Sequence, residues 1–326
     1  MTLIVGQNTA WQKVCILPTL TIGGVNRVEQ VLQYASSKGP NVARALLCMG
    51  QPSLVLGYSG GRTGALLAND LEAEGIRSHL TPIRAETRIC TTYAARDGVS
   101  TEVIEPSPEV TAEERKMFQT IFSSHSAEAG LLFLCGTAVR GESADSYVRM
   151  VREVRRRGGL VIMDAACPES INALSQSPQI LKVNAAELSL VASAPADTPE
   201  QRLEIYRDLS ARHGIRWFFT TMGSRGMEGW DGSELLHAVP PRIHVVNAIG
   251  SGDAASAGIG LALMEAGSGP AAGAMDAPGC FRQALLNGTA MGTANCLNPK
   301  NGWVEPADVS AMREGTVIHR VEAPRR

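Results

Sequence analysis

A glycine-rich turn that opens into a small-residue helix is the part of this sequence best suited to phosphate chemistry. The turn reads I-G-S-G-D and ends at Asp253. Because glycine has no Cβ, Gly250 and Gly252 let the backbone approach a ligand closely. The N–H groups in the first turn of a helix have no partner within the helix, so they can bind an anion. The sequence therefore predicts an anion hole formed by Gly250, Ser251, Gly252 and Asp253, suited to charge that develops during phosphoryl transfer.

Asp253 gives this turn a candidate catalytic group. A carboxylate at the mouth of the anion hole could act as a general base toward a hydroxyl. The alternative is that Asp253 only caps the helix and that the glycines only turn the chain, because short glycine motifs often match by chance. The rest of the chain has to distinguish these two interpretations.

Two stretches nearer the N-terminus carry residues that could bind an acceptor. The run K-G-P-N, from Lys38 to Asn41, places a cation and an amide at a turn into a helix, although the same pattern is typical of an ordinary helix start. Arg88, in the triplet E-T-R, has a guanidinium that could hold a phosphate through two hydrogen bonds. It could equally be a surface arginine on a strand.

Two stretches in the second half of the chain could bind a metal and a nucleotide. In K-V-N-A-A-E, Asn184 and Glu187 lie three residues apart and could hold a hydrated Mg²⁺ through their oxygen atoms, or could form a helix-capping pair. The run T-M-G-S-R-G, from Thr221 to Gly226, reads as a strand followed by a glycine turn. Alone, it indicates only a hairpin.

The composition excludes several classes of protein. The 326 residues are 44% hydrophobic and 19% charged, with a net charge of −2, so neither wholesale disorder nor a basic surface for nucleic acid or anionic membranes is indicated. Seven cysteines without a C-x-x-C pair favour reduced thiols over disulfides or structural zinc. No signal peptide or membrane-spanning run is recognised. We therefore expect a cytoplasmic protein.

The order of apolar runs predicts an α/β fold. From about residue 111, fully apolar runs alternate with longer amphipathic ones, which indicates a mostly parallel central sheet with helices on both faces. The segments at about 10–35 and 86–105 alternate with period 2 instead and predict a separate small β-sheet, a lid, with a D-G turn at Arg96-Asp97-Gly98. We expect a single domain over residues 1–326.

Taken together and in this order, the motifs resemble those of the ribokinase-like (PfkB) family of carbohydrate kinases. N-A-I-G-S-G-D resembles the family's G-A-G-D motif, K-V-N-A-A-E-L its K-P-N-x-x-E-L motif, and T-M-G-S-R-G its S-L-G-x-x-G nucleotide loop. Within the family, G-V-N-R-V at 24–28, K-G-P-N-V-A-R-A-L and E-T-R are most similar to the 1-phosphofructokinase and tagatose-6-phosphate kinase group. The resemblance covers nearly the whole chain.

The resemblance implies an ATP-dependent sugar or sugar-phosphate kinase. Asp253 would deprotonate the acceptor hydroxyl, and the N–H groups of residues 250–253 would stabilise the transferring phosphoryl group. Asn184 and Glu187 would organise Mg²⁺ through its bound waters. The ATP site would be lined by Thr221, Gly223 and Gly226. K⁺ is a further cofactor that some family members use, and the family's lid often forms a homodimer contact.

On the acceptor side, the resemblance implies binding residues but also shows departures. Lys38, Gly39 and Asn41 would hold the acceptor, Arg88 would hold a phosphate on it, and Thr137 stands where the group has serine. Gln12 replaces the aspartate that grips sugar hydroxyls, Ser36-Ser37 replaces a glycine pair, and Arg140 precedes Gly141 in place of proline. We therefore expect an active kinase whose acceptor differs from fructose 1-phosphate and tagatose 6-phosphate.

Two alternatives remain open from the sequence. A nucleotide- or sugar-binding regulator that has lost turnover would fit the missing carboxylate at position 12, but not the intact Asp253. A nucleoside kinase would need an apolar or aromatic acceptor pocket, for which Trp11 is the candidate. The identity of the acceptor, the oligomeric state and the dependence on a monovalent cation are not determined by these residues.

Overall fold

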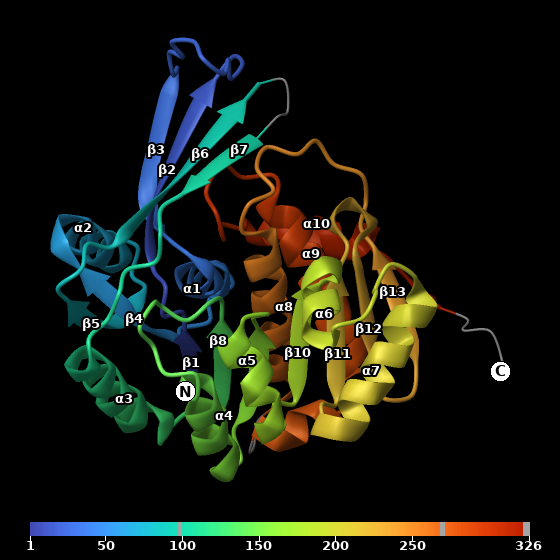
Figure 1. The fold of residues 1–326 in the computed structure, drawn as a ribbon. Helices are drawn as coiled ribbons and strands as arrows, with labels where there is room; N and C mark the ends of the chain where they lie inside the picture. The colour runs from blue at the N-terminus through green and yellow to red at the C-terminus, as the bar shows by residue number, and fades with distance from the viewer. Residues whose placement is uncertain (97–99, 268–270, 322–326) are drawn as a thin grey trace.

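A ten-stranded sheet runs through the molecule, and helices pack on both of its faces (Figure 1). The computed structural model describes residues 1–96, 100–267 and 271–321. The turn predicted at Arg96-Asp97-Gly98 therefore lies, beyond Arg96, outside the described residues.

The central sheet is mostly parallel, which confirms the prediction from the apolar runs. Its strands lie in the order β14-β13-β12-β11-β10-β9-β8-β1-β4-β5, and all neighbours from β11 to β5 pair in parallel. These strands are β1 (Thr2–Val5), β4 (Leu54–Gly60), β5 (Arg77–Ile83), β8 (Leu131–Cys135), β9 (Leu160–Asp164), β10 (Ile180–Asn184) and β11 (Trp217–Thr221). At one edge the antiparallel strands β12 (Met227–Trp230), β13 (Leu235–Val239) and β14 (Val317–Arg320) complete the sheet.

Alternate residues of the buried strands point to opposite faces of the sheet, so they build two hydrophobic cores. Ile4 of β1 belongs to the core covered by α1 (Lys38–Cys48), α2 (Gly61–Ala73), α8 (Ser251–Ala266), α9 (Cys280–Asn295) and α10 (Pro306–Gly315). Leu3 and Val5 belong to the opposite core, covered by α3 (Ala112–Ser126), α4 (Ser146–Arg156), α5 (Pro168–Ala173), α6 (Ala185–Ala192) and α7 (Pro199–His213). Both faces of the sheet are thus covered, as predicted.

A separate four-stranded sheet stands at the end of the molecule where β1 passes upward into β2 (Figure 1). Its order is β3-β2-β6-β7, with β2 (Ala10–Leu17), β3 (Gln30–Ser36), β6 (Arg88–Ala95) and β7 (Ser100–Ile104). The β2–β6 pair is parallel and the other two pairs are antiparallel. We call this sheet the lid; its presence confirms the interpretation of the period-2 segments.

The structure also addresses the search for membrane-spanning segments. Over the stretches that the structure describes, every helix is too short or too polar to cross a bilayer.

Candidate active site

Two cavities meet at the start of α8, between the lid and the carboxyl ends of the parallel strands. The lid cavity, with a volume of about 500 Å³, is lined by Gln12, Arg88 and Glu102 of the lid together with Lys38, Asn41 and Asp253. The turn cavity, of about 510 Å³, is lined by Thr221, Gly223 and Gly226 together with Ser251, Gly252 and Thr289. The first turn of α8 therefore separates the two cavities and is accessible from both.

The first turn of α8 has the form of an anion hole. Gly250 is the N-cap of the helix with φ of 83°, a conformation that glycine adopts without strain. The N–H of Ser251 donates to the Ala248 carbonyl at 3.3 Å, and the N–H of Ala254 donates to the Gly250 carbonyl at 2.9 Å. The N–H groups of Gly252 and Asp253 have no acceptor among the described residues. Two backbone donors are therefore free to bind a ligand at the junction of the cavities.

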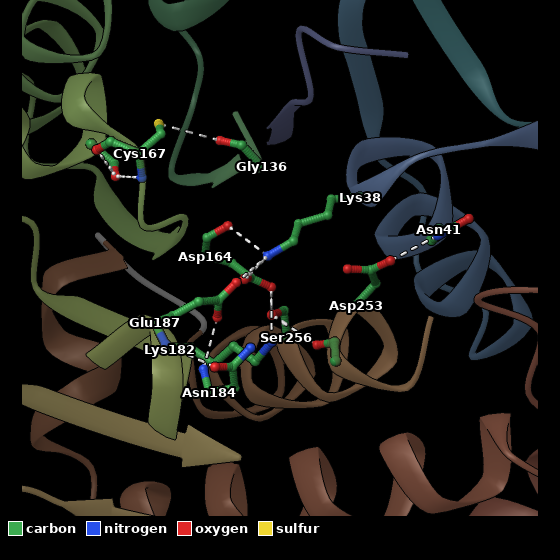
Figure 2. A network of polar contacts seen from close by, with 12 residues as sticks. Lys38, Asn41, Gly136, Asp164, Cys167, Lys182, Asn184, Glu187, Asp253 and Ser256 are labelled. Carbon is green, nitrogen blue, oxygen red and sulfur yellow. Dashed lines mark hydrogen bonds and ion pairs between the residues drawn. The ribbon is translucent and has the colours of Figure 1, made fainter. Parts of the chain in front are cut away.

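Asp253 does not cap α8, because the N-cap is Gly250 and no side chain makes a capping hydrogen bond there. The carboxylate instead accepts a hydrogen bond of 2.7 Å from the Asn41 side-chain amide of α1 (Figure 2). Burial raises the pKa of Asp253 to about 6, and the nearby carboxylate of Asp164 adds to the rise, while Lys38, Lys182 and the Asn41 hydrogen bond oppose it. A carboxylate with such a pKa is suited to proton abstraction near neutral pH.

A buried network of charges lies next to Asp253 (Figure 2). Asp164, at the end of β9, is fully buried and accepts from Lys38 Nζ at 2.7 Å, Lys182 Nζ at 3.0 Å and Ser256 Oγ at 2.6 Å. Burial alone would raise the pKa of Asp164, but the two ammonium groups hold it well below its usual value. Despite its desolvation, the pKa of Lys38 is raised by Asp164, Glu187 and Asp253. Lys38 thus stays charged and is oriented toward the site.

The sequence interpretation missed this network. Asp164, Lys182 and Ser256 come from β9, β10 and α8, and only the parallel arrangement of the strands brings them together. The available signal was a carboxylate directly after the apolar run L-V-I-M, at the strand end where α/β proteins place ligands.

Asn184 and Glu187 form the helix-capping pair that was one of the two alternatives. The Glu187 N–H donates to Asn184 Oδ1 and the Asn184 N–H donates to Glu187 Oε2, both at 2.8 Å. Glu187 also has a second oxygen, Oε1, which lies 3.6 Å from Lys38 Nζ and faces the lid cavity. Capping therefore occupies one carboxylate oxygen and leaves the other directed at the site.

The described residues contain no group of three or more His, Cys, Asp or Glu side chains that could enclose a metal ion. Glu187 Oε1 is a hard oxygen ligand of the kind that Mg²⁺ prefers, and Mg²⁺ commonly keeps several waters and binds one or two carboxylates plus substrate phosphates. The donor set therefore fits a hydrated ion that a phosphorylated ligand helps to hold, and not a closed protein cage.

Most of the residues predicted to bind the acceptor do line the lid cavity: Gln12, Lys38, Asn41, Arg88 and Thr137. Gly39 does not, and a Cβ there would lie 3.0 Å from the Cα of Gly6, so its small size serves the close packing of α1 against the residue that follows β1. The two cationic side chains differ in their contacts. Lys38 is ion-paired, whereas among the described residues Arg88 makes only a 3.3 Å hydrogen bond to the Asn8 carbonyl and its buried Nε has no partner.

A lid carboxylate was not predicted from the sequence. Gln12, which is buried, donates from Nε2 to Thr92 Oγ1 at 2.8 Å. Thr92 pairs across the β6–β7 ladder with Glu102, whose side chain lines the lid cavity and has no hydrogen bond or ion pair to any described residue. The lid cavity therefore has a carboxylate on β7 and a neutral amide at position 12.

Comparison with known proteins adds a family and a fold. A family model described as pfkB family carbohydrate kinase matches residues 15–290. Phosphofructokinase-2 from Escherichia coli, in complex with potassium, superposes with a TM-score of 0.85 at 19% identity over 96% of this chain and 97% of that one. A possible 1-phosphofructokinase from Thermotoga maritima gives 0.85 at 17% identity, over 98% and 99% of the two chains. Arabidopsis thaliana ribokinase, complexed with ribose and ATP, gives 0.71 at 18%, over 96% and 98%.

Proposed function

This chain belongs to the pfkB family of carbohydrate kinases and is an ATP-dependent sugar kinase, and from this premise we propose that it transfers the γ-phosphate of ATP to a hydroxyl of an acceptor bound in the lid cavity. The observation that carries the proposal is the junction of the two cavities at the first turn of α8. There, Asp253 lines the lid cavity, Gly252 lines the turn cavity, and the N–H groups of both residues have no acceptor among the described residues.

In the proposed reaction, ATP occupies the turn cavity and the acceptor occupies the lid cavity. Asp253 takes the proton from the attacking hydroxyl, and the new O–P bond forms as the bond to the β-phosphate oxygen breaks. The N–H groups of residues 250–253 and the charged Lys38 stabilise the negative charge of the transferring group. Because phosphoryl transfer depends mainly on positioning and electrostatics, this arrangement supplies the groups that the reaction requires.

Mg²⁺, when bound, would neutralise charge on the nucleotide phosphates. Glu187, through Oε1, is the residue that would hold its hydration shell, with Asn184 fixing Glu187 through the capping pair. K⁺ remains a further expected cofactor. The E. coli phosphofructokinase-2 complex contains potassium, and a comparison of turnover in KCl and in NaCl would test this for the present chain.

We propose that the acceptor is a polyhydroxy compound that already carries a phosphate. The guanidinium of Arg88, whose Nε has no hydrogen-bond partner among the described residues, is suited to bind a phosphate. Glu102 is suited to accept hydrogen bonds from hydroxyls, a role for which Gln12 offers no charge. An acceptor that binds Glu102 on β7 would be positioned differently from one that binds a carboxylate at position 12. This difference supports a substrate other than fructose 1-phosphate or tagatose 6-phosphate.

A panel of sugars and sugar phosphates, assayed with ATP and Mg²⁺ for ADP release and for the phosphorylated product, tests the proposal. We expect phosphorylated acceptors to give higher kcat/KM than their unphosphorylated counterparts. Fructose 1-phosphate as the best substrate would contradict the altered acceptor. ATP binding without transfer to any member of the panel would favour the binding-regulator alternative.

We also propose that the chain forms a homodimer through the lid. Val31 on β3 and Val103 on β7 are 39% and 54% exposed, and by strand alternation and register both lie on the lid face opposite to Gln12 and Glu102. Ile22 and Val25, in the connection between β2 and β3, are 96% and 85% exposed. Apolar side chains gathered on one element in this way are typical of a protein interface.

A further inference from the structure

The side chain that contacts Asp253 is itself held by two donors. Asn41 donates from Nδ2 to Asp253 Oδ2 at 2.7 Å, while its Oδ1 accepts from Ser36 Oγ at 3.0 Å and from Arg44 Nη1 at 3.2 Å. Asn41, Ser36 and Arg44 are at most 3% exposed, and Ser36 and Asn41 both border the lid cavity. Ser36 is the last residue of β3, and the contact therefore joins a lid strand to α1.

Arg44, which can only donate, and the Asp253 carboxylate, which can only accept, determine which way the Asn41 amide points. If the amide were turned over, its NH₂ group would face the Ser36 hydroxyl and the Arg44 guanidinium, and its carbonyl oxygen would face the Asp253 carboxylate. That arrangement would bring a donor against the Arg44 donor and an acceptor against an anion. The contacts on Oδ1 thus keep the N–H directed at the carboxylate.

The two donors on Asn41 differ in their other roles. Arg44 also donates to Glu74 at 2.6 and 2.9 Å, to the Ala35 carbonyl at 2.7 Å and to the Asn301 carbonyl at 2.8 Å, so it holds the structure together at several points. The Ser36 hydroxyl makes one other recorded contact, a 3.4 Å hydrogen bond accepted from Asn301 Nδ2. Loss of the Ser36 hydroxyl therefore removes fewer contacts than loss of the Arg44 guanidinium.

We propose that Ser36 is a positioning residue for Asp253: its hydroxyl donates to Asn41 Oδ1 and so polarises the Asn41 N–H that donates to the carboxylate. The proposal rests on the proposed function for its catalytic meaning, but its physical content, a chain of two hydrogen bonds ending on Asp253, does not. Because hydrogen bonds in a buried chain reinforce one another, removing the first donor weakens the last bond. Loss of the Ser36 hydroxyl therefore favours the protonated form of Asp253.

Other groups around Asp253 also influence its ionisation, and the comparison must hold them fixed. They are Lys38 on α1, Asp164 at the end of β9, Lys182 on β10 and Cys135 at the end of β8. None of these side chains forms a hydrogen bond with Ser36 or Ser37. Ser37 offers a matched control, because its Oγ is buried one residue away and has no hydrogen-bond partner.

The test is a titration of the full-length enzyme labelled with ¹³C-aspartate, in which the Asp253 carboxyl resonance is identified by its loss in Asp253→Asn. We expect Ser36→Ala to raise the pKa of Asp253 by about 0.5 units, Ser37→Ala to leave it in place, and Ser36→Thr, which keeps a hydroxyl, to restore it. The acidic limb of the kcat–pH profile should move with the NMR value, and turnover at pH 6 should fall roughly twofold in Ser36→Ala.

The outcomes separate this inference from the proposed function. An unchanged Asp253 pKa in folded Ser36→Ala, or an equal shift in Ser37→Ala, would overturn the role of Ser36. A shift in the pKa with no movement of the kcat–pH profile would support the Ser36–Asn41–Asp253 chain while contradicting the role of Asp253 as the base. Circular dichroism of each variant confirms that the compared proteins are folded.

Discussion

At the scale of single residues, the proposed chemistry centres on Asp253, whose environment disfavours the ionised form of its carboxyl group. The carboxylate is buried beside the carboxylate of Asp164, and two lysines only partly compensate. Such a group is costly to keep ionised and is retained where a reaction needs it. Both the activity and the stability of the protein should therefore depend on this position.

Asp253→Asn should reduce turnover by several orders of magnitude and leave ATP affinity nearly unchanged, since it removes a base and keeps the N–H groups of the anion hole. Steady-state assays and calorimetric titration with ATP measure the two effects. Asp208→Asn, on the exposed surface of α7, is the matched control because Asp208 is exposed and ion-paired with Arg212 one turn along the same helix. Near-normal turnover in Asp253→Asn would remove this residue from the mechanism.

The same substitution should change stability in a pH-dependent way. Because the folded-state pKa of Asp253 is raised to about 6 from an ordinary value of 3.8, folding favours the protonated form. The stability that this group contributes is full below pH 3.8 and is lost as the pH rises through 6. Asp253→Asn should therefore raise the Tm by roughly 2–4 °C at pH 8 and by much less at pH 4. A gain confined to acidic pH would show the opposite sign and contradict the pKa shift.

Arg88→Ala should raise KM for the acceptor at least tenfold with a smaller effect on kcat, because the guanidinium would bind a phosphate that does not react. Arg96→Ala is the control, since Arg96 follows the same strand but is exposed and paired with Glu29. Initial rates over a range of acceptor concentrations provide the measurement. An unchanged KM would indicate that the acceptor carries no phosphate at Arg88.

The residues with recognisable motifs could be predicted from sequence, and their partners could not. The run I-G-S-G-D lies between the two cavities and T-M-G-S-R-G lines the turn cavity. Both were predictable because each is a local turn whose function depends on its own backbone. Asp164 and Glu102 were missed, because their roles depend on neighbours from other strands that only the sheet register brings close.

At the scale of elements, the start of α1 holds a strained residue. Ser37 has φ of 105° and ψ of 172°, a backbone conformation that residues with a Cβ seldom adopt. Non-glycine residues in such regions cost on the order of 1–3 kcal/mol, and they persist at sites where the surrounding structure fixes them. The strain coincides with the position where related kinases, by the sequence resemblance, have glycine.

Ser37→Gly should therefore stabilise the protein by about 1 kcal/mol, after the greater chain entropy of glycine in the unfolded state is subtracted. Ser36→Gly should destabilise it, because Ser36 lies in a β-strand and its hydroxyl is hydrogen-bonded. Urea unfolding of both variants measures the difference. A loss of stability in Ser37→Gly would mean that the Ser37 side chain contributes more than its backbone costs.

The elements themselves were predictable to different degrees. The apolar runs between helices predicted the parallel strands, because a strand buried on both faces must be apolar throughout. The antiparallel strand β13, the edge strand β14 and the helix α10 had no comparable signal. The β14 strand is mostly exposed along V-I-H-R, and its pairing with β13 joins segments about 80 residues apart in the chain, so no local pattern specifies it.

At the scale of the whole molecule, the exposed apolar side chains of the lid are the basis for the proposed dimer interface. Val103→Asp should shift the protein from dimer to monomer, because a carboxylate at an apolar interface would be desolvated. Val317→Asp, at an equally exposed position on the far edge strand β14, is the control and should leave the assembly unchanged. Sedimentation at micromolar concentrations distinguishes the two species, and a wild-type protein that sediments as a monomer would contradict the proposed lid interface.

The lid was visible in the sequence as two period-2 segments, but its relation to the site was not. Its strands lie far apart in the chain, at 10–36 and 88–104, and pair through the parallel β2–β6 ladder. Only this pairing places Gln12, Arg88 and Glu102 over one cavity.

The meeting of two separately lined cavities at one helical turn has a consequence for the order of events during turnover. In the proposed arrangement each reactant occupies its own cavity, so either can bind first and either product can leave first. Double-reciprocal plots should consequently intersect to the left of the ordinate, with ADP competitive against ATP and the phosphorylated product competitive against the acceptor. The enzyme would then respond to whichever of its two reactants is scarce, and not to a fixed sequence of arrivals.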